Sequence, residues 1–539
     1  MVRPGRLVLL LAVLVAVTAV LVAPGVASAR QTPRDAPWRV VVLDRITDKT
    51  WSVLAHRGAV GLLRPGFGPT TNRRRALAEL VRGAEVNARL GGVPPGKPLI
   101  NTDKGTGAQI PTCRMCIVLQ LPARGGLTAN DKLFRIAVIG QNFHGLLTSP
   151  TTHIAGLVSI VDIAPTVLIG HQVNALSWQA SSDPLGTLAS LDRQIGSNNR
   201  LKFAALFVLA GLLLLLALLG LRAVATAVPA ALLVNLGLGV TQVSNEVLLM
   251  AGVSAGTALL AFALARFCRR DTALLALYGG VVALYAYTMV RRPEWQAINP
   301  LGPTQNSRFW GIGNQIETLL LAPLLAGAVL ARRRFGLVGF ALFGLFGLVV
   351  MTDNRLGADG GGAIVLGVAL AVLGWRLFRL RLSGFLALLA SAAITVLWLV
   401  SRGLAQHGPD HLRSAFADNG AGLIKSLESR VPLSYVPALH AWTLVLPLLL
   451  VLVATFVVAW RRAEERATRD LLIALGVALV TSLLINDSAA YELAGGVAVV
   501  GAAAHFVPSS APARFRLPVP VLRRAALEPE PVPAESPPS

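Results

Sequence analysis

The stretch FAALFVLAGLLLLLALLGL at residues 203–221 decides the fold class, because it contains no charged side chain. An α-helix of this length reaches roughly 28 Å, close to the ~30 Å thickness of a bilayer's hydrocarbon core. The run does not alternate between polar and apolar residues as a barrel strand does. It is therefore predicted to cross a membrane as a helix.

Further apolar stretches follow, and the whole chain has the composition of a membrane protein. Hydrophobic residues make up 54% of the 539 residues, charged residues only 14%, and the mean hydropathy is +0.63. We expect an α-helical polytopic bundle of about eleven spans between residues 201 and 507. The other spans are predicted at 223–241, 246–266, 271–290, 314–331, 335–352, 361–378, 383–401, 439–460, 470–486 and 489–507.

Residues 1–29 have the features of a secretory signal. Two arginines precede an apolar stretch, and Ala27-Ser28-Ala29 offers a small-residue cleavage site. A cleaved signal peptide and an uncleaved anchor helix both fit this pattern. In either case the region that follows, residues 30–200, is predicted to be exported.

Export of that region predicts the orientation of every span. The alternating spans then place the arginine-rich loops on the inner side, as the positive-inside rule expects. We expect a multi-pass protein of the cell membrane with an extracytoplasmic N-terminal domain and a disordered, cytoplasmic tail at 508–539. The inner arginines are Arg222, Arg266, Arg269, Arg270, Arg332, Arg333, Arg334, Arg376, Arg379, Arg381, Arg461, Arg462, Arg466 and Arg469.

These loops also account for the net charge of +22 and the pI near 11.3. Basic residues spread over short membrane loops orient the spans and contact anionic lipids, so membrane lipids are the expected partners and nucleic acid is not. Of the three cysteines, Cys113 and Cys116 form a lone CxxC in the exported region, and Cys268 falls in an inner loop. The pair is either a local disulfide or two thiols.

The exported region has an α/β pattern. Apolar, β-branched runs at 38–44, 116–121 and 134–139 predict strands, and residues 73–90 predict a helix with Thr70, Thr71 or Asn72 as its cap.

The pieces VVVLDRIT (40–47), GPTTNRRRALAEL (68–80), FRIAVIG (134–140) and TSPTTHIAGLVSIVDIAPTVL (148–168) resemble the alkaline-phosphatase and sulfatase superfamily. The resemblance implies that Asp44 is a metal ligand, if the domain is active, and that Thr70 or Thr71 is the nucleophile at a helix start. The domain lacks the superfamily's late Asp-His-Gly motif and is short, so we expect a truncated, degenerate relative. A divalent metal is possible but not expected. On that alternative Asp44, Thr71 and Asp162 have structural roles as caps.

Three polar segments border the spans on the predicted outer face. The first, NSRFWGIGNQIE at 306–317, places Asn314 and Glu317 on one helical face, with Arg308 as a plausible ion-pair partner for the acid. The alternative is that Glu317 reaches out to the interface. A buried acid in a span indicates a bundle interior or a wet cavity.

The second segment, TDNRLGADGGG at 352–362, contains Asp353, Arg355 and Asp359. These side chains could bind a cation, a phosphate through Arg355, or each other. The third segment contains Asn486, Asp487 and Ser488, with Glu492 following, between the last two spans.

A longer outer loop at 402–438 includes Arg430, and residues 412–431 predict a helix on the membrane surface. RFWGIGNQ, DNRLGADGGG and LINDSAAYE together resemble an uncharacterised bacterial family of multi-pass membrane proteins with the same kind of exported domain. That family is expected to have Glu where this chain has Gln315.

The sequence favours an outer-leaflet pocket that binds or processes a lipid-linked phosphate or glycan. Arginines would bind phosphate, and Asp353, Asp359 or Glu317 would act as base. Arg308, Asn314, Asn486, Asp487 and Arg430 are the candidate substrate-binding residues. A transporter with an external vestibule, or a scaffold with an inactive phosphatase-like domain, remains an alternative. The middles of the spans contain few polar residues, which favours one-sided chemistry.

Overall fold

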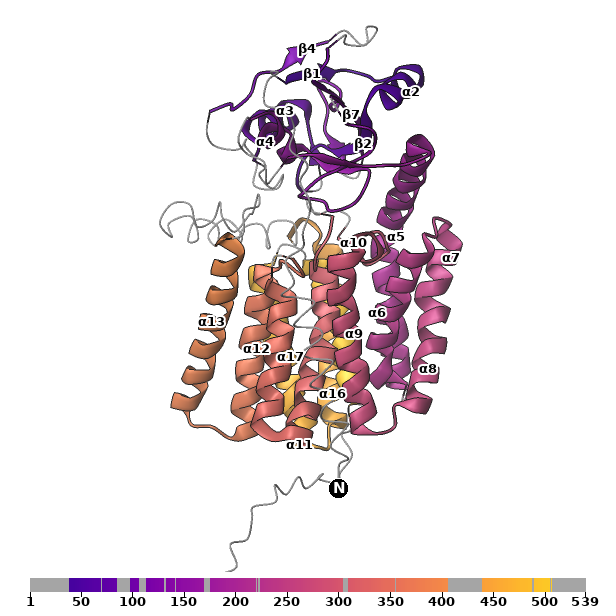
Figure 1. Cartoon of the computed structure of the whole chain (residues 1–539). Helices are drawn as coiled ribbons and strands as arrows, with labels where there is room; N and C mark the ends of the chain where they lie inside the picture. The colour runs from indigo at the N-terminus through magenta and orange to yellow at the C-terminus, as the bar shows by residue number, and fades with distance from the viewer. Residues whose placement is uncertain are drawn as a thin grey trace, which may run out of the picture.

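The computed structural model describes most of the chain: residues 38–68, 70–84, 97–105, 113–129, 132–140, 142–168, 175–219, 221, 223–303, 309–353, 355–405, 439–486, 489–504 and 506. The predicted signal, the 412–431 surface helix and the tail lie outside these residues. The described part is mostly helical, with a small N-terminal α/β domain that covers one end of a helical bundle (Figure 1). We call this end the capped end and the opposite one the far end.

A mixed sheet forms the centre of the α/β domain, with strand order β10-β8-β2-β7-β5-β1-β4 and β9 paired to β2. β1 is parallel to β4 and β5, whereas β7 is antiparallel to β2 and β5. The predicted strands near 38–44, 116–121 and 134–139 are confirmed. The strands are β1 (Arg39–Leu43), β2 (Ala59–Arg64), β4 (Asp103–Lys104), β5 (Cys116–Gln120), β7 (Phe134–Ile139), β8 (Gly145–Thr148), β9 (Leu157–Ser159) and β10 (Ser177–Gln179), with β3 (Thr70–Thr71) and β6 (Thr128–Ala129) as a separate pair.

Alternation along β1 divides the core of this domain into two layers. Val40 and Val42 pack in the layer that contains α3 (Arg73–Arg82) and α4 (Ile163–Val167), which follows the 3-10 turn η2 (Ile160–Asp162). Val41 and Leu43 pack in the layer that contains α2 (Asp48–Arg57) and residues of the bundle. The second layer is thus a core shared by the two parts of the chain.

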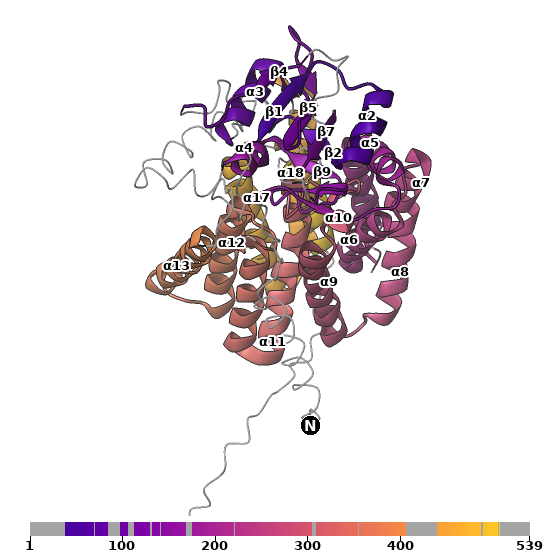
Figure 2. The ribbon, with the colours of Figure 1, turned by 45° about the horizontal axis from the view of Figure 1, so that its top comes forward.

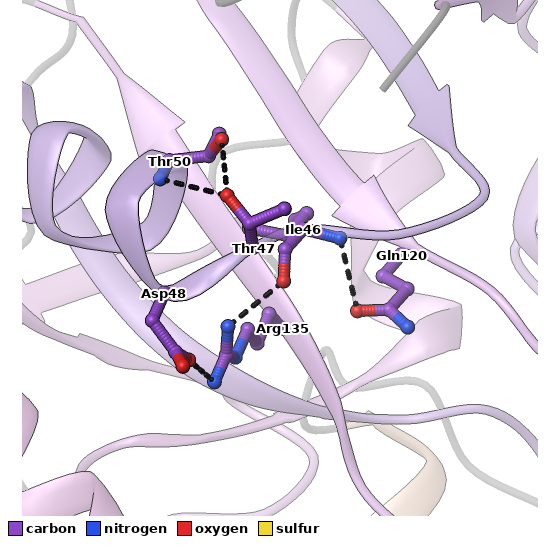
Figure 3. A network of polar contacts seen from close by, with 6 residues as sticks. All are labelled: Ile46, Thr47, Asp48, Thr50, Gln120 and Arg135. Atoms are coloured by element: carbon purple, nitrogen blue, oxygen red, sulfur yellow. Dashed lines mark hydrogen bonds and ion pairs between the residues drawn. The ribbon is translucent and has the colours of Figure 1, made fainter. Parts of the chain in front are cut away.

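Arg135 of β7 fastens α2 to the sheet (Figure 3). Its guanidinium donates to the carbonyl oxygen of Ile46 at 2.8 Å and to the carboxylate of Asp48. Thr47 caps the helix by accepting from the backbone N–H of Thr50 at 3.2 Å. The contacts of Arg135 therefore hold the start of α2 against β7.

Nine helices among the described residues are long and apolar enough to cross a membrane. This agrees with the predicted multi-pass bundle, and the count of eleven spans stays a prediction. α13 and α16 are the least buried of these helices, and α13 lies at one edge of the bundle (Figure 2). The helices are α5 (Pro184–Leu218), α6 (Val224–Thr241), α7 (Glu246–Ala251) continuing through the π-turn η4 (Gly252–Gly256) into α8 (Thr257–Phe267), α9 (Asp271–Arg291), α11 (Asn314–Thr352), α12 (Gly360–Phe378), α13 (Leu382–Ala405), α16 (Trp442–Arg462) and α17 (Arg466–Ile485), together with the shorter α10 (Pro293–Ala297) and α18 (Ala489–Ala503).

α11 folds back on itself near the far end. A straight helix of its 39 residues would reach roughly 58 Å, almost twice a hydrocarbon core. Gly336 breaks the helix with φ 68°, and the two arms pack closely, since a Cβ on Gly327 would lie 2.4 Å from the ring of Phe343. Gly347 faces Leu324 in the same way. The arms correspond to the predicted spans 314–331 and 335–352.

α5 is longer than its predicted span. It begins at Pro184, with Asp183 as its cap, and runs without interruption from the α/β domain into the bundle. Leu188, Leu191 and Ile195 of its first half belong to the shared core. The sequence boundary near residue 200 therefore falls inside a helix.

Candidate functional site

The three polar segments meet at the capped end, where α11, α12 and α18 begin and α17 ends. Glu317 lies in the first turn of α11, Asp359 caps α12, Asn486 caps the end of α17, and Glu492 lies in the first turn of α18. We call these four residues the polar cluster. Their assembly follows the expectation that segments on one face of the membrane lie near one another.

Glu317 is the centre of the polar cluster. Its side chain is 0% exposed, and Asn486 Nδ2 donates to its Oε2 at 2.8 Å. Asn486 is itself held by Ser482, whose Oγ accepts at 2.9 Å. The charges of Asp359 and Glu492 also act on the Glu317 side chain. Three acids therefore gather around one buried side chain, and Glu317 lies in the bundle interior as the sequence indicates, not at the interface.

The glycines of the 352–362 segment make this approach possible. A Cβ on Gly362 would lie 3.0 Å from Glu317 Cγ, and one on Gly361 would lie 2.6 Å from Asn486 Oδ1. Asp359 Oδ1 meanwhile accepts from the backbone N–H of Gly362 at 3.0 Å, which caps α12. The glycines thus serve helix packing around the acids.

Asp353 and Arg355 bind each other rather than the polar cluster. The guanidinium of Arg355 lies 3.2 Å from the Asp353 carboxylate, and the Arg355 backbone N–H also donates to it. The Asp353 carbonyl oxygen accepts from the N–H of Leu356 and of Ala358, which closes a tight turn. The sequence left open whether these side chains bind a cation, a phosphate or each other, and in the structure Asp353 is paired with Arg355.

The remaining candidates of the membrane half are placed only in part. Asn314 is the first residue of α11, half-buried, and its carbonyl oxygen accepts from Thr318 Oγ1 at 2.7 Å. Arg308, Asp487 and Arg430 lie outside the described residues.

Two buried cations, which the sequence did not indicate, lie between the α/β domain and the capped end of the bundle. Lys202 of α5 is 5% exposed and lies over the ring of Tyr491 at 5.9 Å. Arg64, at the end of β2, is 1% exposed and lies over the ring of Phe309 at 5.1 Å. Their positive charges are close enough to interact. We call Arg64 and Lys202 the cation pair.

The first turn of α18 joins the two groups. Tyr491 contacts Lys202, and the next residue, Glu492, interacts with Glu317. Two consecutive residues of α18 therefore make different contacts: Tyr491 contacts the lysine of the cation pair, and Glu492 interacts with the acids. One signal was available in the sequence: Lys202 is the only lysine between Lys132 and Lys425, in a region that otherwise uses arginine.

The candidates of the α/β domain do not fit a metal site. Asp44 forms an ion pair with Arg73 at 2.7 Å and lies 3.9 Å from Arg124, so its surroundings oppose a cation. No group of three or more His, Cys, Asp and Glu side chains in the described part of the chain could hold a metal ion.

Thr71 and Asp162 are both buried, but neither caps a helix as expected. Thr71 belongs to β3, and the cap of α3 is Asn72, which accepts from the N–H of Arg75 at 2.9 Å. The Asp162 carboxylate accepts from Ser149 and Thr151 instead of the N–H groups of α4, because those hydroxyls face it inside the core. Cys113 and Cys116, left open by the sequence, form a disulfide.

The chain matches no protein-family model, no curated protein and no solved structure. The resemblances to the alkaline-phosphatase superfamily and to the bacterial membrane-protein family remain predictions.

Proposed function

We propose that the protein is a bacterial cell-envelope membrane protein that binds or processes a lipid-linked phosphate or glycan at the outer leaflet. One observation carries this proposal: at one end of the bundle, two consecutive residues of α18 contact a buried cation and the acids, since Tyr491 lies against Lys202 and Glu492 interacts with Glu317. A phosphate needs cations, and a hydroxyl that attacks or leaves it needs a proton acceptor or donor.

The geometry favours particular residues for the two roles. Lys202 and Arg64 would attract the phosphate, because both are buried and their charges act at short range in a medium of low dielectric constant. Glu317 and Asp359 are better candidates for the base than Asp353, which is ion-paired with Arg355.

A transporter is the alternative, and it would need polar groups across the full thickness of the bundle. Asn235, a buried polar residue within α6, bonds to groups of the bundle itself: it contacts Tyr285 Oη and the N–H of Leu301. At the far end, ion pairs of Arg333 with Glu465 and of Arg376 with Asp470 join neighbouring helices. These contacts favour a one-sided site.

The proposal includes a topology. Eleven crossings follow if each arm of α11 crosses the membrane and α18 is a further, short span. The α/β domain would then be extracytoplasmic, and the arginines of the far end would be cytoplasmic, as the positive-inside rule requires.

Binding of two matched lipids to the protein in nanodiscs tests the function. We expect a long-chain prenyl phosphate to bind at least about tenfold more tightly than the prenyl alcohol of the same length, a difference of ~1.4 kcal/mol. A sugar-bearing prenyl phosphate distinguishes a glycan-processing protein from one that needs the phosphate alone. Equal affinities for the alcohol and both phosphates would rule the proposal out.

Two variants assign the roles. Lys202→Met should abolish the preference for phosphate, whereas Lys132→Met, at an exposed lysine of the α/β domain, should retain it. Asp359→Asn should retain the binding preference and lose any turnover of the phosphate lipid. Loss of preference in the Lys132 variant as well would mean that the lysines act only through the overall charge.

A further inference from the structure

Residues 309–313, which we call the docking segment, connect the α/β domain to the polar cluster. Phe309 is 0% exposed and belongs to the core shared with the α/β domain. Trp310 donates from Nε1 to the carbonyl oxygen of Thr151 at 2.8 Å, and its ring contacts that of His153 edge to face, with centroids 4.6 Å apart. Both aromatic residues are thus anchored by the α/β domain.

The other end of the docking segment holds both acids of α11 and α12. The carbonyl oxygen of Gly313 accepts from the N–H of Glu317 at 2.9 Å, the first hydrogen bond of α11. The N–H of Ile312 donates to the carbonyl oxygen of Gly357 at 2.9 Å, two residues before Asp359. A shift of the docking segment would therefore move Glu317 and Asp359 relative to each other.

The backbone is strained at two residues, one at the start of the docking segment and one directly before Asp359. Phe309 has φ 56° and Ala358 has φ 48°, in the left-handed region that residues with a side chain rarely adopt. Such conformations persist where surrounding contacts hold them, and they gather at functional sites. Phe309 is held by its burial in the shared core, and Ala358 by its hydrogen bond to Asp353. The α/β domain therefore helps to hold one of the two strained residues, Phe309.

We propose that Trp310 is a positioning residue through which the α/β domain fixes the arrangement of Glu317 and Asp359. The inference rests on the proposed function for the importance of these acids. It does not depend on the identity of the substrate, so its test uses no substrate. Failure of lipid-phosphate binding would therefore leave this test intact, and failure of this test would leave the binding assay intact.

The test measures the reactivity of the Glu317 carboxyl in membranes. Dicyclohexylcarbodiimide enters membranes and adds to a protonated carboxyl to give a stable N-acylurea, which peptide mass spectrometry assigns to a residue. We would measure the labelling rate of Glu317 against pH in the full-length protein. Glu317→Gln supplies the blank, and Trp310→Phe removes the Nε1–H donor to Thr151 while keeping a ring against His153.

We expect Trp310→Phe to change the labelling rate at least about threefold and to move the midpoint of its pH profile, with Trp310→Ala changing both further. Trp295→Phe is the matched control, because Trp295 is a half-buried tryptophan at the same end whose ring contacts Arg292. A merely structural loss would lower the thermal stability of the protein without moving the pH midpoint. An unchanged rate and midpoint in both Trp310 variants would overturn the proposal.

Discussion

Asn486 Nδ2 donates to Glu317 Oε2 at 2.8 Å, although the two residues lie 169 positions apart in the sequence. The bond ties the end of α17 to the first turn of α11 inside the bundle, where both residues are buried. Away from water, a donor or acceptor that loses its partner is costly to the folded state. The bond is the central contact of the polar cluster.

This contact predicts opposite results for its two partners. Asn486→Leu should lower the free energy of unfolding by about 1–3 kcal/mol, because a buried carboxylate oxygen loses its donor. Glu317→Gln keeps an acceptor for Asn486 and removes repulsion by Asp359 and Glu492, so its thermal midpoint should be equal to or above that of the unaltered protein. Thermal unfolding in detergent measures both, and equal damage in the two variants would contradict the account.

Gly311 is predicted to be irreplaceable. Its φ of 82° lies in the left-handed region, and a Cβ there would lie 2.5 Å from the carbonyl oxygen of Gly357. Gly311→Ala should destabilise the protein by about 1–3 kcal/mol through strain and displacement of the 356–359 turn.

Gly280→Ala is the control for that substitution. Gly280 lies inside α9, where an added Cβ meets nothing within 4 Å. Alanine there should stabilise the helix by up to about 1 kcal/mol. Thermal midpoints that fall together in the two variants would show that the close approach of Gly311 to Gly357 does not matter.

The sequence predicted the elements whose residues alternate or repeat locally, including β1, β5, β7, α3 and the apolar spans. It also predicted that Glu317, Asp359 and Asn486 would lie on one side of the bundle. It could not predict which acid faces which partner, because Asp353 and Asp359 have similar neighbours in the chain and differ only in tertiary contacts. The burial of Arg64 and Lys202 could not be predicted either, because it depends on tertiary contacts.

Stability should depend on pH through His153. Partial desolvation of the imidazole, whose ring packs against Trp310, lowers the pKa of His153 from 6.5 to about 4 although the residue as a whole is exposed, so the unfolded chain binds a proton more readily than the folded protein. The contribution of this residue is fully present above pH 6.5 and is lost as the pH falls from about 6.5 to 4. The residue keeps contact with solvent, so the loss should be a modest fraction of what full burial would give.

His153→Asn isolates that contribution. Asparagine tolerates the left-handed backbone of this position, which has φ 56°. Its thermal midpoint should fall less between pH 7 and pH 4.5 than that of the unaltered protein. His56→Gln, at an exposed position in α2, should show the full decrease. Equal decreases in all three proteins would exclude His153 as the group that titrates.

Cysteine accessibility should report the orientation of the bundle. Cys268 is a free cysteine between α8 and α9 at the far end, and the Cys113–Cys116 disulfide lies in the α/β domain. In intact cells, a charged maleimide should label Cys113 and Cys116 after treatment with a membrane-impermeant reductant, and Cys268 only after permeabilisation. Labelling of Cys268 in intact cells, absent in Cys268→Ser, would reverse the proposed topology.

The start of α5 shows why a domain boundary is difficult to place by composition. Asp183 and Pro184 form a good helix start, and Leu188, Leu191 and Ile195 repeat at helical spacing. This stretch is polar enough to resemble the end of a water-soluble domain, yet it continues directly into the apolar span. Hydropathy therefore locates the membrane crossing, but it does not locate the start of the helix.

That continuous helix has a consequence for how the protein can be dissected. Cutting the chain before residue 201 would expose Phe309 to water and would remove Ala297, Ile298 and Phe309 from the core layer that they share with α2 and the sheet. The two parts are therefore not independent folding units. Heat or denaturant should melt the sheet and the capped end of the bundle in a single cooperative transition.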